Sequence, residues 1–240
     1  MLVAVTGANG FVAKHLCQNL KSNGFSVRQI QRMSGSSEDI FQIKCLDSRT
    51  DWREALSNVD VVIHCASLVH QPESNSSAIT NEYYEINAFG TKNLAEQASS
   101  MGVKRLIFIS SIKVNGERTN GIDSFDHESI PSPKDAYSQS KLLAEKYLLD
   151  ISAKTGLEVV VIRPPLVYGP GVGANFKKLL NLIYKGFPLP FGKFNNRRSL
   201  IFVGNLVSFI IKCIQSEKVD GKILLISDPE SISTKNLIRY

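Results

Sequence analysis

Cysteine, long apolar runs and clustered charge are scarce in this sequence, and each scarcity argues against a class of protein. Its 240 residues contain four cysteines, none of them in a C-x-x-C pair. This spacing argues against a disulfide framework or a zinc site and indicates reduced packing residues. No apolar stretch reaches the roughly 18 residues of a membrane span, and no basic leader opens the chain. We therefore expect a cytoplasmic protein without a membrane partner.

Charge and metal-binding side chains are equally dispersed. The net charge is +6, but lysine and arginine never form a run of five or six. Because both a basic stripe and a nucleic-acid-binding motif are missing, we expect no nucleic-acid partner. No set of His, Cys, Asp and Glu has metal-ligand spacing, so we predict no metal. His64, a lone histidine closing an apolar strand, fits a satisfied core residue better than a catalytic base.

What the sequence does contain is a regular alternation of short β-branched runs with longer helical patterns. Apolar residues recur at three and four positions in the helical stretches, which is typical of βαβ units around a parallel sheet. The predicted strands are 2–6, 25–30, 41–46, 59–66, 103–110, 157–163 and 223–227, and the predicted helices lie near 10–23, 51–57, 80–100, 136–155 and 173–186.

The turn between the first predicted strand and the first predicted helix reads TGANGFVA. Bare backbone at Gly7 and Gly10 lets N–H groups and the positive helix end meet a pyrophosphate, which a Cβ would hold away. The position after the first strand of a βαβ series favours a dinucleotide site over a purely steric glycine turn. Ala13 stands where a third glycine would serve helix–strand packing, so its methyl group should spare the cofactor.

The fold class that follows is α/β, a Rossmann-type doubly wound parallel sheet. We expect residues 1–165 to form the dinucleotide-binding domain. After Arg163 the chain becomes rich in proline and glycine, and residues 166–240 should form mostly a small substrate-binding lobe, with strands and helices returning to the core. Because the last helical pattern stops in its second turn, we expect this lobe to be incomplete at the carboxyl end.

Two further patterns place reactive side chains near that cofactor. Tyr137 and Lys141 of YSQSK share one face of a predicted helix whose N-cap is Asp135. A phenol with an ordinary pKa of about 10 can act as a base at neutral pH only if a cation stabilises the phenolate, as Lys141 would. Ser110 and Ser111 end a parallel strand on the ligand side of the sheet, where one hydroxyl could bind a reacting oxygen.

Taken together, several motifs resemble the extended short-chain dehydrogenase/reductase family, in its NAD(P)-dependent sugar-nucleotide epimerase/dehydratase branch. The similarity covers nearly the whole chain. Within the branch, SSIKVNGE, GPGVGANF and NNRRSLIFV are most similar to bacterial enzymes acting on UDP-N-acetylhexosamines and their 4-keto-6-deoxy forms in surface-polysaccharide synthesis. The motifs that carry the resemblance are TGANGFVA, Asp47, HCAS (64–67), YEINAFGTKNL (84–94), FISSIKVNG, YSQSK and RPPLVYGPG.

The resemblance implies roles for individual residues. Tyr137 would be the general acid/base at the sugar 4-position, Lys141 would lower its pKa and hold the nicotinamide ribose, and Ser111 would orient the same oxygen. Asn87 would be a structural bridge between strands. The implied substrate-binding residues are Ser111, Asn175 and Arg198, with Arg197 as a substitute. The implied cofactor-binding residues are Gly7, Asn9, Gly10, Phe11, Val12, Gln31, Arg32, Asp47, Ala66, Tyr137, Lys141 and Pro164.

Three departures from the family pattern bear on the activity. Ile112 and Lys113 occupy the places where dehydratases of the branch carry an Asp-Glu pair, which disfavours dehydration. Gln31 replaces the acidic residue that NAD-specific relatives place on the ribose, and the Arg32 that follows could pair with a 2′-phosphate, so the cofactor is NAD or NADP. Asn115 stands where many epimerases carry tyrosine, and the sequence gives no consequence for this change.

We therefore predict an NAD(P)-dependent epimerase/oxidoreductase acting at the 4-position of a UDP-sugar, in particular a UDP-N-acetylhexosamine, for surface polysaccharide. An NADPH-dependent 4-keto-6-deoxy sugar-nucleotide reductase needs the same residues and stays open. A non-catalytic dinucleotide-binding regulator is a more distant alternative, because Ser111, Tyr137 and Lys141 are all present. The family also implies a homodimer formed through helices 80–100 and 136–155.

Overall fold

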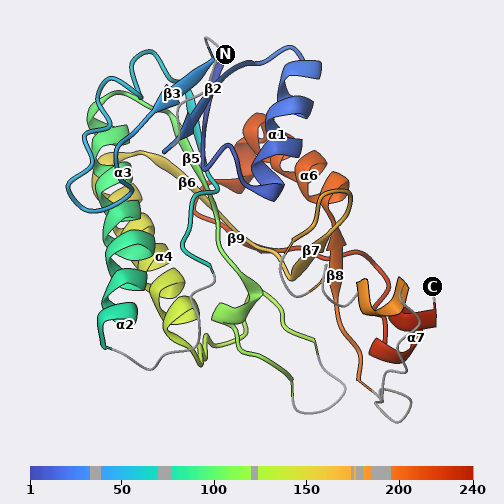
Figure 1. Cartoon of the computed structure of the whole chain (residues 1–240). Helices are drawn as coiled ribbons and strands as arrows, with labels where there is room; N and C mark the ends of the chain where they lie inside the picture. The colour runs from blue at the N-terminus through green and yellow to red at the C-terminus, as the bar shows by residue number, and fades with distance from the viewer. Residues whose placement is uncertain are drawn as a thin grey trace.

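One parallel sheet organises the chain, as Figure 1 shows for this computed structural model, which describes residues 1–32, 39–69, 77–119, 124–173, 176, 181–184 and 196–239. The strand order is β3-β2-β1-β4-β5-β6-β9, and β7 forms a separate parallel pair with β8. The predicted Rossmann-type sheet is therefore confirmed. The strands are β1 (Leu2–Thr6), β2 (Ser26–Gln31), β3 (Ile40–Gln42), β4 (Val61–His64), β5 (Arg105–Ile109), β6 (Glu158–Arg163), β7 (Leu166–Tyr168), β8 (Leu200–Phe202) and β9 (Ile223–Leu225).

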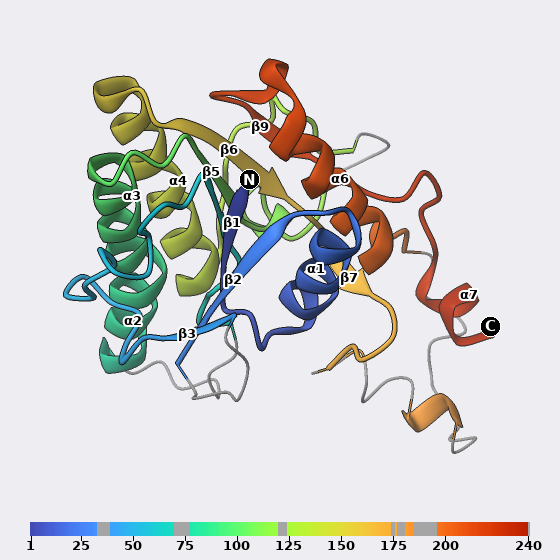
Figure 2. The same ribbon diagram turned by 90° about the horizontal axis from the view of Figure 1, so that it is seen from above.

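Helices cover both faces of this sheet (Figures 1 and 2). On one face lie α1 (Phe11–Ser22) and α6 (Val203–Gln215). On the other lie α2 (Ser77–Tyr83), the π-helical segment η1 (Tyr84–Phe89), α3 (Gly90–Ser100) and α4 (Ala136–Thr155). Two 3-10 segments, η2 (Ile112–Val114) and η3 (Glu217–Val219), and the short α7 (Thr234–Arg239) complete the described elements.

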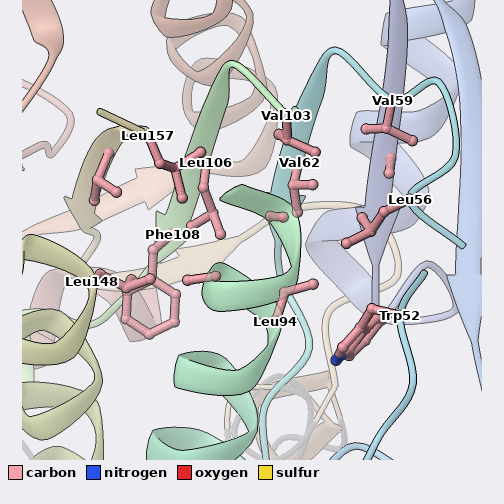
Figure 3. Packing of buried hydrophobic residues seen from close by; sticks show 14 of the residues in the cluster. Trp52, Leu56, Val59, Val62, Leu94, Val103, Leu106, Phe108, Leu148 and Leu157 are labelled. Carbon is pink, nitrogen blue, oxygen red and sulfur yellow. The ribbon is translucent and has the colours of Figure 1, made fainter. Parts of the chain in front are cut away.

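Side chains alternate between two cores because successive residues of a strand point to opposite faces. In β1, Val3 and Val5 pack toward α1 and α6, whereas Ala4 between them packs toward the opposite face. Figure 3 shows the second core, in which Phe108 of β5 meets Leu148 of α4. Each buried strand contributes to both layers, which explains why the strands read as almost continuously apolar.

Two predicted elements differ from the structure near the sheet edge. Residues 53–58 form turns rather than a helix. One α-helical hydrogen bond forms there, from Leu56 N–H to Trp52 O (2.8 Å), and two residues later Asn58 has a φ of 59°. The left-handed backbone at Asn58 prevents the chain from continuing as an α-helix. Burial of Trp52 and Leu56 holds the turns in place. The predicted strand 41–46 is shortened to β3, Ile40–Gln42.

The helical stretch predicted at 80–100 begins earlier, at Ser77, and changes to π-helix over Tyr84–Phe89 before α3. The predicted helix at 173–186 lies largely outside the described residues. Within the described part of the chain, no helix is both long enough and apolar enough to span a membrane.

The chain after residue 165 serves both the sheet and a separate unit. β7 and β8 pair with each other beside the main sheet, and an antiparallel bridge joins Arg198 to Ile232. α6 and β9 pack with the core: β9 pairs with β6, and α6 packs against α1. The division into a dinucleotide-binding domain and a substrate lobe at residue 165 stays a prediction.

Candidate active site

The glycine turn after β1 allows a close approach of two strand ends. Gly7 has φ of 66°, and a Cβ added there would lie 2.8 Å from the Cα of Ala66. Ala66 follows β4, and its N–H donates to the Thr6 hydroxyl at 3.3 Å. Glycine is therefore required at position 7 both by its backbone conformation and by its neighbour. The same contact places Ala66, one of the predicted cofactor residues, directly beside the turn.

The start of α1 fits a pyrophosphate. The helix begins after Gly10, which supplies no side-chain cap, and its first turn contains no acidic residue. The first N–H groups of a helix have no partner within it and carry a partial positive charge, so they are available to an anion. Asn9, Phe11 and Val12 surround this end, and Ala13 is buried against the sheet as predicted. The residues present thus fit the dinucleotide that the sequence predicts.

Ser111 and Tyr137 meet beyond the carboxyl end of β5. Ser111 begins η2, and its Oγ accepts the Lys113 N–H at 3.2 Å. Tyr137 lies in the first turn of α4, which starts at the predicted N-cap Asp135. Burial raises the pKa of Tyr137 to about 12, the hydrogen bond with Ser111 acts to lower it, and the charges of Asp135 and Tyr83 raise it. The structure therefore brings together two of the three residues predicted to be catalytic.

Lys141 lies one turn further along α4 than Tyr137 and is buried. Its Nζ donates to the Ile109 carbonyl at 2.9 Å and lies 4.3 Å from the centre of the Phe108 ring, a cation–π distance. Burial lowers the pKa of Lys141 to about 8. Because the ammonium is held by the end of β5, the expected lowering of the phenol pKa by Lys141 is not a feature of this arrangement, and the pKa of Tyr137 remains high.

His64 is the last residue of β4, and both nitrogens of its ring make hydrogen bonds. Its Nδ1 lies 2.7 Å from Thr6 Oγ1 and its Nε2 lies 2.9 Å from Thr91 Oγ1. Thr91 donates its proton to the Asn87 carbonyl, so Nε2 of His64 donates to Thr91 and Nδ1 accepts from Thr6. Burial, aided by the charge of Lys141, lowers the pKa of His64 to about 3. His64 is thus a neutral core residue that ties β4 to β1 and α3.

Asn87 has a structural role, but it joins other elements than predicted. Its amide donates to the Leu68 carbonyl (3.0 Å) and to Ser140 Oγ (3.1 Å). Its Oδ1 accepts from Leu68 N–H (2.8 Å) and from Ser67 Oγ (3.0 Å). With all its hydrogen-bonding positions used, Asn87 connects η1 to α4 and to the loop after β4 rather than bridging two strands.

A buried ion pair at the ends of β5 and β6 was missed by sequence reasoning. The side chains of Arg163 and Glu145 are each 2% exposed, and Nε lies 3.0 Å from Oε1. Ser110 donates to the same carboxylate, and Arg163 Nη1 donates to Asn115 Oδ1 at 2.9 Å. Asn115 therefore has a defined function: it satisfies a buried guanidinium donor. A carboxylate one turn after Lys141 on a buried helix face was the signal that could have revealed this network.

Asp47 uses its carboxylate within its own loop. Oδ1 accepts the Arg49 N–H at 2.9 Å, and Oδ2 lies 3.2 Å from Arg49 Nη2. Burial acts to raise the pKa of Asp47, but hydrogen bonds from Arg49 and Cys45 outweigh it and the net pKa is lowered. The loop lies against the start of α3, where a Cβ on Gly90 would come within 3.3 Å of the Asp47 Cα. Its place near the adenine stays a prediction.

The remaining predicted cofactor residues lie at strand ends. Gln31 ends β2, and the exposed Arg32 accepts a hydrogen bond from Gln42 Nε2 on its carbonyl at 3.1 Å. Pro164 is buried after β6, and its carbonyl accepts the Ile112 N–H at 2.9 Å. Pro164 thereby fixes η2 to the end of β6, next to Ser111.

Apart from Ser111 itself, no predicted substrate residue is brought to the Ser111–Tyr137 pair by a contact among the described residues. Arg198 is exposed just before β8, and its backbone exchanges two hydrogen bonds of 2.9 Å with Ile232. Arg197 donates from Nε to Ser231 Oγ at 2.9 Å. Asn175 lies outside the described residues.

Cysteines and metal ligands give no second site in the described part of the chain. All four cysteines are free thiols. Burial raises the pKa of Cys17 and Cys213 to about 11 and that of Cys65 to about 12, as is typical of inert packing residues. Among the residues with described positions, no three His, Cys, Asp or Glu side chains are arranged to hold a metal ion.

Comparison with known proteins agrees with this geometry. The family model "NAD dependent epimerase/dehydratase family" matches residues 3–227. A "UDP-glucose 4-epimerase" of Vibrio cholerae is 41% identical over 241 residues, which covers 99% of this chain and 74% of the relative. An "N-acetyl-alpha-D-glucosaminyl-diphospho-ditrans,octacis-undecaprenol 4-epimerase" of Escherichia coli O157:H7 is 29% identical, with 87% of this chain and 61% of the relative covered.

Solved structures share the fold. MoeE5 in complex with UDP-glucuronic acid and NAD superimposes with a TM-score of 0.84 at 26% identity, covering 99% of this chain and 80% of that chain. A UDP-glucuronic acid 4-epimerase from Bacillus cereus in complex with NAD gives a TM-score of 0.83 at 23% identity, covering 97% of this chain and 80% of that chain.

Proposed function

Since the chain belongs to the NAD dependent epimerase/dehydratase family, we propose that it is a UDP-sugar 4-epimerase whose substrates include a UDP-N-acetylhexosamine. The observation that carries the proposal is that Ser111 and Tyr137 lie beyond the end of β5, close enough for the Ser111 hydroxyl to act on the pKa of the phenol, on the same edge of the sheet as the glycine turn after β1. The 41% identity to a UDP-glucose 4-epimerase supports the reaction. The relative named for an N-acetylglucosaminyl lipid diphosphate supports an N-acetylated sugar, and with it a role in surface polysaccharide.

The chemistry follows from the positions of the side chains. Tyr137 takes the proton from the sugar 4-hydroxyl and later returns it, while Ser111 holds the same oxygen by a hydrogen bond. Bound NAD supplies the acceptor and donor of the hydride at that carbon. The α1 N-terminus and the turn at Gly7 and Gly10 bind the cofactor's pyrophosphate, and Lys141 holds its nicotinamide ribose.

Proton abstraction requires the phenol pKa to fall, because a group with a pKa of about 12 is almost fully protonated at neutral pH. Lys141 has a pKa of about 8 and so keeps most of its charge at pH 7. We propose that its ammonium moves from the Ile109 carbonyl toward the phenol when the site is assembled, which would stabilise the phenolate. The absence of an acid pair at Ile112 and Lys113 supports epimerisation over dehydration.

The activity is tested with purified protein and Tyr137→Phe, which deletes only the phenolic oxygen. With UDP-N-acetylglucosamine or UDP-glucose and no added cofactor, the wild-type protein should form the C4 epimer. NMR of the sugar measures its formation. Tyr137→Phe should lose turnover by at least 100-fold, the lower range for general acid–base catalysis, while NAD affinity by calorimetry stays within about threefold. Retained epimerisation in Tyr137→Phe would contradict the assignment.

The cofactor that the protein holds or consumes separates the epimerase from the reductase and the regulator. An epimerase carries out a redox-neutral reaction and holds NAD through the cycle, so mass spectrometry of the denatured protein should find NAD released in near-stoichiometric amount. A 4-keto-6-deoxy reductase would consume one NADPH per product, and the exposed Arg32 is placed to support NADP binding. Binding of a dinucleotide without conversion of any sugar nucleotide would favour a regulator.

A homodimer also remains a proposal. Phe89, the last residue of η1, is 37% exposed just before α3, and its ring packs tilted against Tyr147 of α4 with ring centres 6.2 Å apart. Lys92 lies over the same tyrosine ring at 5.4 Å. This aromatic surface on α3 and α4 supports pairing through those helices, and sedimentation of the wild-type protein against Phe89→Ser would test it.

A further inference from the structure

An ion pair links the two segments that carry the Ser111 and Tyr137 hydroxyls. Lys113 lies in η2, two residues after Ser111, and Asp135 lies two residues before Tyr137. Lys113 Nζ donates to Asp135 Oδ2 at 2.7 Å, and the two side chains are 47% and 39% exposed. This contact thus spans from the loop after β5 to the start of α4, beside the proposed catalytic pair.

Each residue of the ion pair also makes a hydrogen bond within its own segment. The other oxygen of Asp135, Oδ1, accepts the Ser138 N–H at 2.7 Å, and the Asp135 N–H donates to Ser138 Oγ at 3.2 Å, a capping box. On the other side, the N–H of Lys113 donates to Ser111 Oγ. Asp135 therefore uses one oxygen to begin the helix that carries Tyr137 and the other to hold Lys113.

The same pair acts on the charge environment of the phenol. The groups that act on the pKa of Tyr137 are Ser111, Asp135 and Tyr83, whose ring centre lies 6.2 Å from that of Tyr137. Lys141, one turn further along the same helix, donates to the Ile109 carbonyl instead. Besides burial, the negative charge of Asp135 raises the pKa of Tyr137. Burial acts to raise the pKa of Asp135, but hydrogen bonds and the charge of Lys113 lower it, so this carboxylate stays ionised.

We propose that Lys113 is a positioning residue for the Ser111–Tyr137 pair, holding η2 against the first turn of α4 and offsetting the charge of Asp135. The proposal rests on the proposed function. In this chain a lysine stands where dehydratases of the branch carry an acid, so the position serves the phenol rather than the expulsion of water. An ordinary surface ion pair would have no effect beyond stability.

The test compares Lys113→Met, which keeps most of the side-chain length but removes its charge, with Lys113→Arg, which keeps the charge. The matched control is Lys154→Met, which removes the exposed Lys154–Asp150 pair (2.6 Å) near the far end of α4. We expect Lys113→Met to lower kcat about tenfold with KM within twofold. The acid limb of its kcat–pH profile should move to higher pH, because an uncompensated Asp135 makes the phenolate harder to form. Lys113→Arg should restore both values, and Lys154→Met should change neither.

A second measurement does not depend on turnover. Tyrosine is replaced throughout by 3,5-difluorotyrosine, whose lower phenol pKa brings the titration into a range where the protein stays folded, and the Tyr137 signal is assigned by its loss in Tyr137→Phe. The 19F titration of Tyr137 should shift to higher pH in Lys113→Met and return in Lys113→Arg.

An unchanged 19F titration together with a superimposable kcat–pH profile in Lys113→Met would overturn the proposal. A shifted titration in a protein that converts no UDP-sugar would leave the effect of Lys113 on Tyr137 intact and refute the proposed function alone. A loss of activity that follows thermal stability equally at every pH would assign Lys113 a structural role only, and so would also overturn the proposal.

Discussion

Replacing Arg163 by methionine should be among the most damaging single changes outside the proposed catalytic residues. The guanidinium makes three hydrogen bonds to side chains, two to Glu145 and one to Asn115. The methionine fills much of the same space but leaves a carboxylate with a side chain only 2% exposed without its cation. Removing one partner of a buried ion pair costs about 3–5 kcal/mol, because the remaining charge keeps its desolvation penalty.

The loss should be visible by urea unfolding monitored by circular dichroism and by a fall in Tm of about 6–20 °C, from about 2–4 °C per kcal/mol for a chain of this size. Lys154→Met is the matched control, since it breaks an ion pair of similar length whose side chains are 69% and 57% exposed. It should cost under about 0.5 kcal/mol. Burial, rather than the ion-pair distance, decides the difference.

The double variant Arg163→Met with Glu145→Leu separates the charge from the shape. Because a buried ion pair can often be replaced by apolar side chains at little cost, the double variant should recover at least half of the lost free energy of unfolding. If Arg163→Met costs no more than Lys154→Met, or if the double variant is as unstable as the single one, then the pair is not the buried anchor that the structure indicates.

Two further predictions concern the strand ends at the glycine turn. Gly7→Ala should lower the free energy of unfolding in urea by more than about 2 kcal/mol and weaken NAD binding by calorimetry, because a Cβ 2.8 Å from the Ala66 Cα adds to the strain of φ 66°. Gly24→Ala, where φ is 79° and nothing lies within 4 Å of the added Cβ, should cost only about 1–2 kcal/mol and leave NAD binding unchanged. Equal effects of the two substitutions would refute the steric argument. The free energy of unfolding should fall by about 1.6 kcal/mol from pH 6.5 to 5 on account of His64, because its pKa is lowered to about 3 in the fold and the unfolded chain binds the proton first. His64→Gln should flatten this decline, and an unchanged slope would mean that His64 is not the buried neutral group.

Features set by neighbours along the chain were predictable from sequence. The alternation of apolar runs with helical patterns predicted a parallel sheet with two covered faces, and helical spacing put Tyr137 and Lys141 on one face of α4. The Asp135 cap is likewise local, since the side chain and the N–H that it accepts are three residues apart. Where local signals were weak, as in the turns at 53–58 that follow Trp52, the predicted helix was wrong.

The sequence by itself therefore determined the class of fold, the place of the glycine turn and the residue types of the proposed site. The tertiary structure alone decided how those residues are held. Asn115 meets Arg163 across 48 positions of the chain, and His64 meets Thr6 across 58. Such partners are chosen by the packing of strands and helices, and the protonation of buried groups follows from desolvation, which no local pattern of residues encodes.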